Sequence, residues 1–236
     1  MRSIRSALPL GLLLGVALIP AAGAGAAEAK APIAKPAQAE SDDDVVLPSR
    51  VSVAIRRTER SLDHAEDHID EGEYRLSKRS LLSVRRNMYR ADRAARRQMN
   101  APPPPEGEEG EETTTGPDSV IAVLSLDSTV VTTVAGLFDT NSKGVVDSLS
   151  TAMFRTLNSR DKLLDRVIGL DPEGAGADYS DGMADTLDGY ADEVANLTEA
   201  LEDDTLSAGG QRVLTRALDQ VEATHAKINT AFGGGE

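Results

Sequence analysis

Hydrophobic residues between Ser49 and Asn100 recur at helical spacing, in one phase before Gly72 and in another after it. The first stripe repeats every seven residues and the second steps alternately by three and four, and both spacings keep side chains on one helix face. The first consists of Ile55, Leu62, Ile69 and Leu76, with Ala65 on the same side, and the second of Leu81, Val84, Met88, Ala91 and Ala95. A phase change at a glycine predicts an antiparallel helical hairpin over 49–100, with helices at about 50–70 and 74–99 and Ser49 as the N-cap.

Four further amphipathic segments follow between residues 118 and 232. Asp118 can cap the first, the second spans about 145–168, the third carries residues 183–201, and the fourth spans about 207–231. Their stripes are Val120, Leu124, Val131, Val134 and Phe138; Val146, Leu149, Met153, Leu157, Leu164 and Ile168; Met183, Leu187, Tyr190, Val194, Leu197 and Leu201; and Val213, Leu214, Ala217, Val221 and Ile228. Short turns between such helices predict an up-and-down four-helix bundle. The β-branched run at 120–126 is also compatible with a strand.

Two segments between these units have almost nothing to bury. Residues 28–48 alternate Ala, Lys and Pro before three consecutive Asp, which predicts a disordered spacer. Residues 101–117 contain four consecutive prolines followed by mutually repelling glutamates, which predicts an extended Pro/Glu-rich linker. The predicted fold class is therefore all-α: a helical hairpin plus an up-and-down four-helix bundle, with a disordered N-terminal spacer and a Pro/Glu linker.

The first 27 residues have the pattern of a secretory signal peptide. Arg2 and Arg5 form a positive region, residues 7–19 are apolar, and residues 20–27 are small and suit a cleavage site. The alternative is an uncleaved membrane anchor, for which the apolar run is short. No later apolar run reaches spanning length by this interpretation. The sequence thus predicts a mature chain without a transmembrane span, secreted, extracellular or associated with the cell envelope.

Composition narrows the classes of function. The chain is 40% hydrophobic but only 3% aromatic and lacks Trp, which favours closely spaced helices over an aromatic-rich sandwich. It has no Cys, which excludes disulfides, thiolate chemistry and Cys-bound metals. Its formal net charge is −14, so nonspecific nucleic-acid binding by the whole molecule is not expected.

Charge is divided unevenly along the chain. Residues 74–99 hold nine Lys or Arg and one acid, whereas residues 101–236 hold 8 basic and 26 acidic residues. The basic segment predicts a contact with an anionic envelope polymer, an anionic lipid or an acidic protein surface. The residues proposed for this contact are Arg85, Arg86, Arg90 and Arg93. The alternative, which the charge division favours, is pairing within the chain, with the acidic bundle and with four acids of the preceding helix, Asp63, Glu66, Asp67 and Asp70.

His64 and His68 are four residues apart, so both rings lie on one helix face. This is a metal-ligand spacing, and Glu71 can add an oxygen one turn later, as in a weak zinc site. Ala65 occupies the position where a zinc-protease helix carries its general base. The alternative is a pair of solvated histidines among acids.

The segment 139–150 resembles an EF-hand calcium loop. Asp139, Asn141 and Asp147 stand at ligand positions one, three and nine, and Gly144 at the sixth position. The resemblance implies weak calcium binding. Two positions depart from it, since Lys143 and Ser150 replace the fifth ligand and the bidentate glutamate; the alternative is an ordinary helix–turn–helix corner.

The sequence contains no Gly-x-Ser-x-Gly, no phosphate-binding Gly-rich loop and no paired-carboxylate motif, so it predicts no enzyme activity and no catalytic residue. His225 lies on the apolar stripe of the last segment without a nucleophile nearby, and the acids of residues 169–185 are expected to form a solvated loop. The sequence predicts a secreted, noncatalytic helical protein with a binding or structural role at the envelope or outside the cell. The alternative is a metal-binding helical protein that uses the 139–150 loop or the two histidines.

Overall fold

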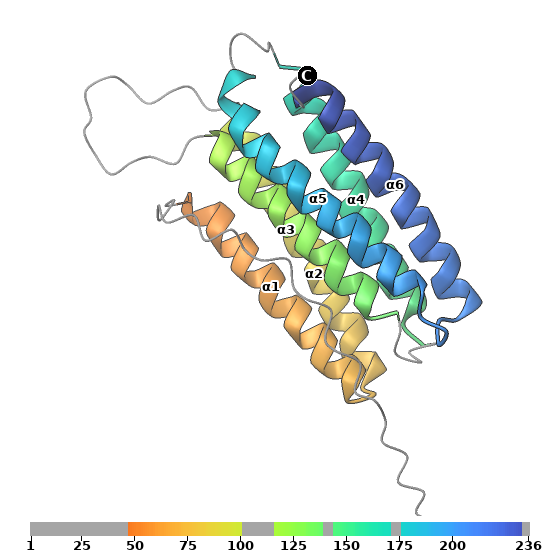
Figure 1. Ribbon diagram of the computed structural model, residues 1–236. Helices are drawn as coiled ribbons and strands as arrows, with labels where there is room; N and C mark the ends of the chain where they lie inside the picture. The colour runs from red at the N-terminus through yellow and green to blue at the C-terminus, as the bar shows by residue number, and fades with distance from the viewer. Residues whose placement is uncertain (1–46, 101–115, 139–143, 171–175, 233–236) are drawn as a thin grey trace, which may run out of the picture. The chain divides into compact units, whose positions relative to one another are not determined.

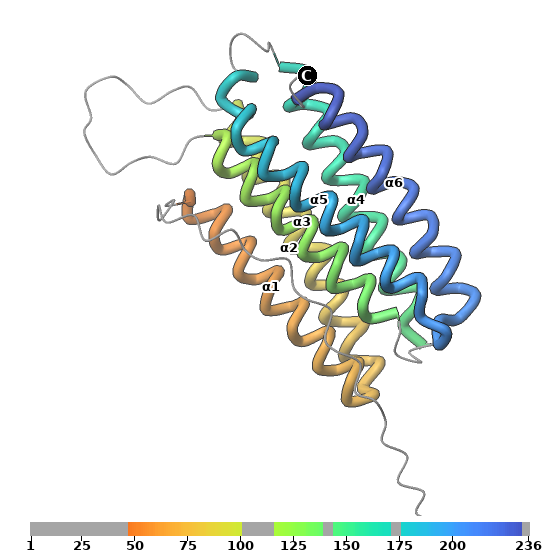
Figure 2. The backbone as a smooth tube through the Cα atoms, viewed as in Figure 1, coloured from red at the N-terminus to blue at the C-terminus, as the bar shows by residue number. Residues whose placement is uncertain are grey.

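Six α-helices make up the described part of the computed structural model, which covers residues 47–100, 116–138, 144–170 and 176–232 (Figures 1 and 2). They are α1 (Ser49–Asp70), α2 (Tyr74–Met99), α3 (Gly116–Gly136), α4 (Val146–Ile168), α5 (Ser180–Leu201) and α6 (Ala208–Phe232), with a short 3₁₀ turn (Ala177–Tyr179) before α5. The described residues contain no strand, so the all-α prediction is confirmed. Residues 120–126 belong to α3, because its β-branched side chains pack inside the bundle instead of pairing in a sheet.

Successive helices run in opposite directions, which confirms the predicted up-and-down bundle (Figure 1). Within it, the main packing contacts join α3 to α4, α4 to α6, α6 to α5, and α5 to α3. The ring order is therefore α3–α4–α6–α5, and the consecutive helices α4 and α5 face each other across a diagonal. A contact between α4 and α5 must consequently cross the centre of the bundle.

The hairpin packs on the bundle, a point the sequence left open. Helix α2 lies between α1 on one side and α3 and α4 on the other, and α1 also touches α3. The end of α2 meets the start of α3: a Cβ on Gly116 would lie 3.0 Å from the backbone oxygen of Gln98. The two ends of the predicted linker are thus adjacent, although its residues 101–115 lie outside the described residues.

The predicted stripe of α2 forms part of the shared core. Its five members, Leu81, Val84, Met88, Ala91 and Ala95, are at most 3% exposed. Burying a side chain of the Leu, Val or Met type contributes about 1.5–3 kcal/mol. On α1, Leu62 and Ile69 are buried as predicted, whereas Ile55 is only partly buried. Helix α2 is therefore the main apolar link between hairpin and bundle.

Helix α3 is long and apolar enough to cross a membrane by length and composition, with a mean hydropathy of 1.6 over its best window. The prediction that no later apolar run reaches this length is wrong for α3. Two facts indicate a core helix: 67% of that window is buried inside the protein, and the acidic Asp127 lies in its middle. The absence of a membrane span stays a prediction.

The predicted signal peptide (1–27) and nearly all of the predicted spacer (28–48) lie outside the described residues. Export and cleavage therefore stay predictions. Helix α1 begins at Ser49 itself, with Pro48 as the residue before it and no side-chain cap. The predicted N-cap role of Ser49 is thus wrong by one position.

Candidate functional site

The turn between α1 and α2 is built by a Schellman motif. The backbone N–H of Glu73 donates to the carbonyl of His68 over 2.7 Å, and that of Gly72 donates to the carbonyl of Ile69 over 3.0 Å. Gly72 has a φ of 73°, a left-handed conformation that glycine adopts at little cost. The glycine thus explains why the helical phase slips here, and it brings residues 68 and 73 to the same end of the hairpin.

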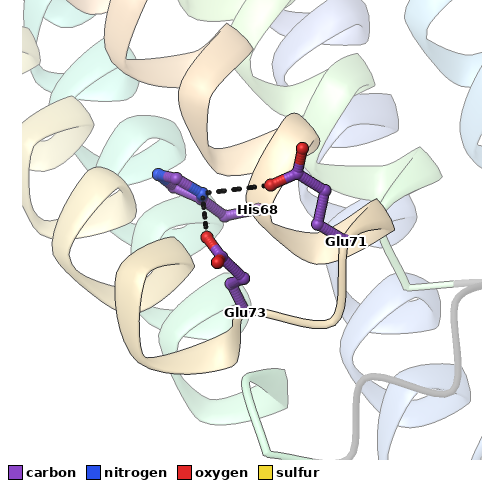
Figure 3. Close-up of side chains that lie close together, drawn as sticks. All are labelled: His68, Glu71 and Glu73. Atoms are coloured by element: carbon purple, nitrogen blue, oxygen red, sulfur yellow. Dashed lines mark ion pairs between the residues drawn. The ribbon is translucent and has the colours of Figure 1, made fainter.

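Three potential ligand side chains converge at this turn (Figure 3). His68 Nδ1 lies 2.9 Å from Glu73 Oε2 and 4.0 Å from Glu71 Oε2, and the three ligand atoms all lie within 4.8 Å of one another. The side chain of His68 is 27% exposed, that of Glu71 is 66% exposed, and that of Glu73 is 47% exposed. His68 Nδ1 itself is inaccessible to solvent and makes no well-formed hydrogen bond, despite its closeness to the carboxylates.

His64 is not a member of this group, although the sequence pairs it with His68. Its ring is edge-on to that of His68, with 6.4 Å between the ring centroids, and it is exposed. The structure therefore brings together His68 and Glu71 from the predicted set and adds Glu73. Sequence spacing did not reveal Glu73, because the chain reverses between it and His68.

The predicted calcium loop is described only at its end. Asp139 and Asn141 lie outside the described residues, and Asp147 is an exposed residue in the first turn of α4. Gly144 does not have the positive φ that Gly72 has, and a Cβ there would contact the side chain of Tyr74 at 3.8 Å. Calcium binding stays a prediction.

One face of α2 carries a line of arginines, here called the basic face. Its members recur at steps of three, four and seven residues and are all exposed: Arg75, Arg79, Arg86, Arg90, Arg93 and Arg97. This spacing places them opposite the buried stripe of the same helix. The first and the last are 22 positions apart, or roughly 33 Å at 1.5 Å per residue. The basic face is therefore long, narrow and turned to solvent.

The four predicted contact residues differ in their positions. Arg86, Arg90 and Arg93 belong to the basic face, whereas Arg85 is half-buried beside it. Arg90 Nη1 donates to the Asn87 side-chain oxygen over 3.2 Å, which orients that guanidinium. Three of the four predicted residues are thus placed together on one exposed surface.

The neighbouring part of α4 is also basic. Arg96 is paired with the buried Asp92, and its pKa is lowered by burial and by the cation of Arg166 on α4. Arg155, Lys162 and Arg166 are exposed and are seven and four residues apart, which places them on one side of α4. The alternative of pairing with the acidic bundle expects acids beside α2, but the α4 side chain that acts on Arg96 is the cation Arg166.

A buried polar cluster inside the bundle was not predicted. Arg160 of α4 donates from Nη1 to both carboxylate oxygens of Glu193 on α5, over 2.9 and 2.7 Å, and both side chains are 0% exposed. Ser128 of α3 donates to the same carboxylate over 2.8 Å, and the Arg160 guanidinium lies 4.3 Å from the centre of the Tyr190 ring. The ion pair crosses the diagonal of the bundle and so ties α4 to α5.

The electrostatics of this cluster are set by burial. Burial alone would lower the pKa of Arg160, but the Glu193 carboxylate together with Tyr190 and Asp127 outweighs burial and raises that pKa, so Arg160 stays charged. Burial raises the pKa of Asp127 well above its ordinary value, and Arg160 only partly offsets this. Among the described residues, Asp127 Oδ1, the Tyr190 hydroxyl and two Arg160 nitrogens lack a hydrogen-bond partner. The cluster is thus one cation with two competing carboxyl groups.

A sequence signal for the cluster did exist. Arg160 lies three residues after Leu157 and four before Leu164, within the apolar stripe of its helix. Glu193 lies in the same way between Tyr190 and Leu197. When two neighbouring segments each carry a charged residue within the apolar stripe, and the charges are opposite, the pattern predicts a buried ion pair.

The described helices of the bundle form surface hollows, among them the following two. One of about 350 Å³ lies between α5 and α6, and one of about 180 Å³ lies between α4 and α6. The larger is lined by Leu201, Gln211, Arg212, Thr215, Arg216 and Asp219. The smaller is lined by Asp161, Leu164, Gln220, Ala223, Thr224 and Lys227, of which Gln220 and Thr224 donate to Asp161. Neither lining includes a histidine or a recognisable nucleophile with its base.

No protein-family model, no curated protein and no solved structure matches this chain. Its function is therefore inferred from three features of the described residues. These are the basic face of α2, the ligand cluster at the hairpin turn and the ion pair in the bundle core.

Proposed function

We propose that this is an exported, noncatalytic binding protein that holds an extended anionic polymer of the cell envelope against the basic face of α2. One observation carries the proposal: six arginines occupy a single exposed face of one helix, opposite its buried stripe. Because that stripe is fixed in the core, the arginines are held in a line by the fold. A ligand with regularly repeated charges suits such a line.

Arginine chemistry supports an anionic ligand with phosphate or carboxylate groups. The guanidinium group presents a planar fork of donors that matches both groups, and it stays charged at any physiological pH. The chain as a whole carries −14, so a polyanion is repelled by most of the molecule. Binding must then be local to α2 and the adjoining basic side of α4, and it must weaken as salt screens the contact.

A polymer is favoured over a membrane surface because α2 has little apolar surface to insert. Helices that lie in a membrane interface bury an apolar face among the lipids. The apolar face of α2 is already buried in the protein core. Tyr74 and Tyr89, at 39% and 60% exposure, are the exposed large hydrophobic side chains of the described residues. Both tyrosines belong to α2, so contact with anionic lipid would be mainly electrostatic, with two tyrosine rings as its apolar part.

The proposed noncatalytic role rests on the chemistry of the basic face, whose guanidinium groups supply positive charge and hydrogen-bond donors for binding. The buried Arg160–Glu193 pair is closed to solvent, so it is not within reach of a substrate.

Titration with long-chain inorganic polyphosphate tests the proposal. Fluorescence anisotropy of the labelled polymer should report binding by the wild type and at least about tenfold weaker binding by Arg86→Gln/Arg93→Gln, since each lost contact typically removes a charge-assisted interaction. The matched control is Arg212→Gln/Arg216→Gln, which removes the same charge from α6, a helix that has no substantial contact with α2.

The outcomes separate the candidate partners. Equal loss in both double variants would show that net charge, and not the basic face, controls binding, and would overturn the proposal. Vesicles of phosphatidylglycerol in phosphatidylcholine serve as the membrane arm. Binding to these vesicles without binding to polyphosphate would replace the polymer by a lipid surface.

A further inference from the structure

The hairpin turn combines a nitrogen ligand with two carboxylates in a backbone that is already fixed. In the Schellman motif, the third residue from the end of α1 and the second residue after its C-cap are held close, and a hydrophobic contact usually joins them. Here these residues are His68 and Glu73, and the C-cap residue between them is Glu71. A ligand pair thus occupies the place of the usual hydrophobic contact.

We propose that this turn is a binding site for a divalent transition metal ion such as Zn²⁺, with His68 Nδ1, Glu71 and Glu73 as its protein ligands. The three ligand atoms lie within 4.8 Å of one another, close enough to surround one ion after small side-chain adjustments (Figure 3). Catalytic zinc sites hold Zn²⁺ with three protein ligands and a fourth position open to water, and this cluster offers the same number of protein ligands. The proposal is independent of polyanion binding by α2.

The state of His68 Nδ1 points to a ligand at this place. The atom is inaccessible to solvent, yet it makes no well-formed hydrogen bond and faces two carboxylates. The nitrogen lies 2.9 Å from a Glu73 oxygen, so one metal ion at about 2.0–2.1 Å from each atom could bind both. A metal ion between the imidazole and the carboxylates would satisfy the nitrogen lone pair and both oxygens together.

The local electrostatics also favour a cation. Asp67, Asp70 and Glu71 lie in the last turn of α1 and at its C-cap, where the helix dipole is negative, whereas Glu73 is the N-cap residue of α2. Carboxylates at that end raise the free energy of the folded state, and a divalent cation would relieve their repulsion. The imidazole selects among cations, because nitrogen suits zinc whereas calcium prefers six to eight oxygens.

Isothermal titration calorimetry of the full chain with Zn²⁺ tests the site. The wild type should bind one ion, and His68→Ala and Glu73→Gln should each weaken binding at least about tenfold, as expected when one of three ligands is lost. His64→Ala is the matched control, since it removes a neighbouring histidine on the same helix. It should leave the affinity within about twofold, and Ca²⁺ should give no comparable heat.

Three results would overturn the assignment. They are no zinc binding by the wild type, unchanged binding by His68→Ala, or equal losses in His64→Ala and His68→Ala, which would favour the histidine pair instead. Circular dichroism without metal checks that each variant is folded. If His68→Ala does not fold, Glu73→Gln decides the question alone, because it keeps the size of an exposed side chain. Polyphosphate binding by His68→Ala should equal that of the wild type, so the two proposals fail separately.

Discussion

The buried pair of Arg160 and Glu193 makes a sharp prediction about stability. Replacing Arg160 by Met leaves the Glu193 carboxylate at 0% exposure with the Ser128 hydroxyl as its hydrogen-bond donor. An uncompensated buried charge is destabilising because the interior solvates it poorly. Arg160→Met should therefore unfold far more easily than the wild type, even though methionine suits an apolar core.

The size of the effect follows from the complete burial of both partners. Breaking a buried ion pair by removing one partner costs about 3–5 kcal/mol, whereas replacing both by apolar side chains is often neutral or stabilising. For a chain of this length, 1 kcal/mol shifts Tm by about 2–4 °C. Arg160→Met should thus lower Tm by roughly 6–20 °C, and Arg160→Met/Glu193→Met should recover most of that loss.

Urea unfolding followed by circular dichroism measures the four members of this double-mutant cycle. A coupling free energy of at least about 2 kcal/mol is expected between the two positions. The control is Lys227→Met, which breaks an ion pair with Asp165 whose side chains are 51% and 53% exposed. Such a half-exposed pair contributes about 0–1 kcal/mol, so the control should change little.

Two outcomes would refute the reasoning on the core. A loss below about 1 kcal/mol in Arg160→Met would show that Glu193 is not held in a dry interior. Additive single losses, with no recovery in the double variant, would show that the two side chains do not interact. Either result would contradict the diagonal contact between α4 and α5.

Two further predictions concern Asp127 and the glycines of α5. Burial raises the pKa of the Asp127 carboxyl group, so the folded state binds its proton more tightly than the unfolded state does. The pKa of Asp in an unfolded chain is about 3.9. The free energy of unfolding of the wild type should therefore fall, relative to that of Asp127→Asn, as pH rises above roughly 4. Urea unfolding of both proteins at several pH values measures this, and parallel curves would contradict it. A Cβ on Gly182 would lie 2.6 Å from Ile121 Cγ1, so Gly182→Ala should lower the free energy of unfolding by about 1–3 kcal/mol. A Cβ on Gly189 would meet nothing within 4 Å, so Gly189→Ala should raise the free energy of unfolding by about 0.5–1 kcal/mol through helix propensity. Thermal melts of the two alanine variants should shift in opposite directions, and equal shifts would refute the contact.

The helices could be predicted from the sequence because their apolar positions follow the helical period closely. Leu81, Val84, Met88, Ala91 and Ala95 were placed on one face, and all five are buried. Packing of α2 on the bundle could not be predicted in the same way, since spacing gives a buried face but not the element that covers it. The contact between the start of α3 and Gln98 depends on tertiary packing that no local pattern records.

The candidate sites were only partly predictable, for two physical reasons. Glu73 joins His68 because a glycine turn reverses the chain, and helical spacing does not extend across such a turn. Helical spacing does not predict burial of Arg160 and Glu193, because a charged residue within an apolar stripe usually lies at its flank. Only the packing of α4 opposite α5 brings the two charged side chains together as a buried ion pair.

The most direct test of polyanion binding by α2 is the salt dependence of the polyphosphate affinity. A plot of log affinity against log salt concentration should be steep for the wild type, because each neutralised anionic group releases a counterion. If polyphosphate behaves like nucleic acids, removing two contacts in Arg86→Gln/Arg93→Gln should make the slope shallower by roughly 1.4–1.8. Identical slopes for the wild type and this variant would contradict a binding surface on the basic face.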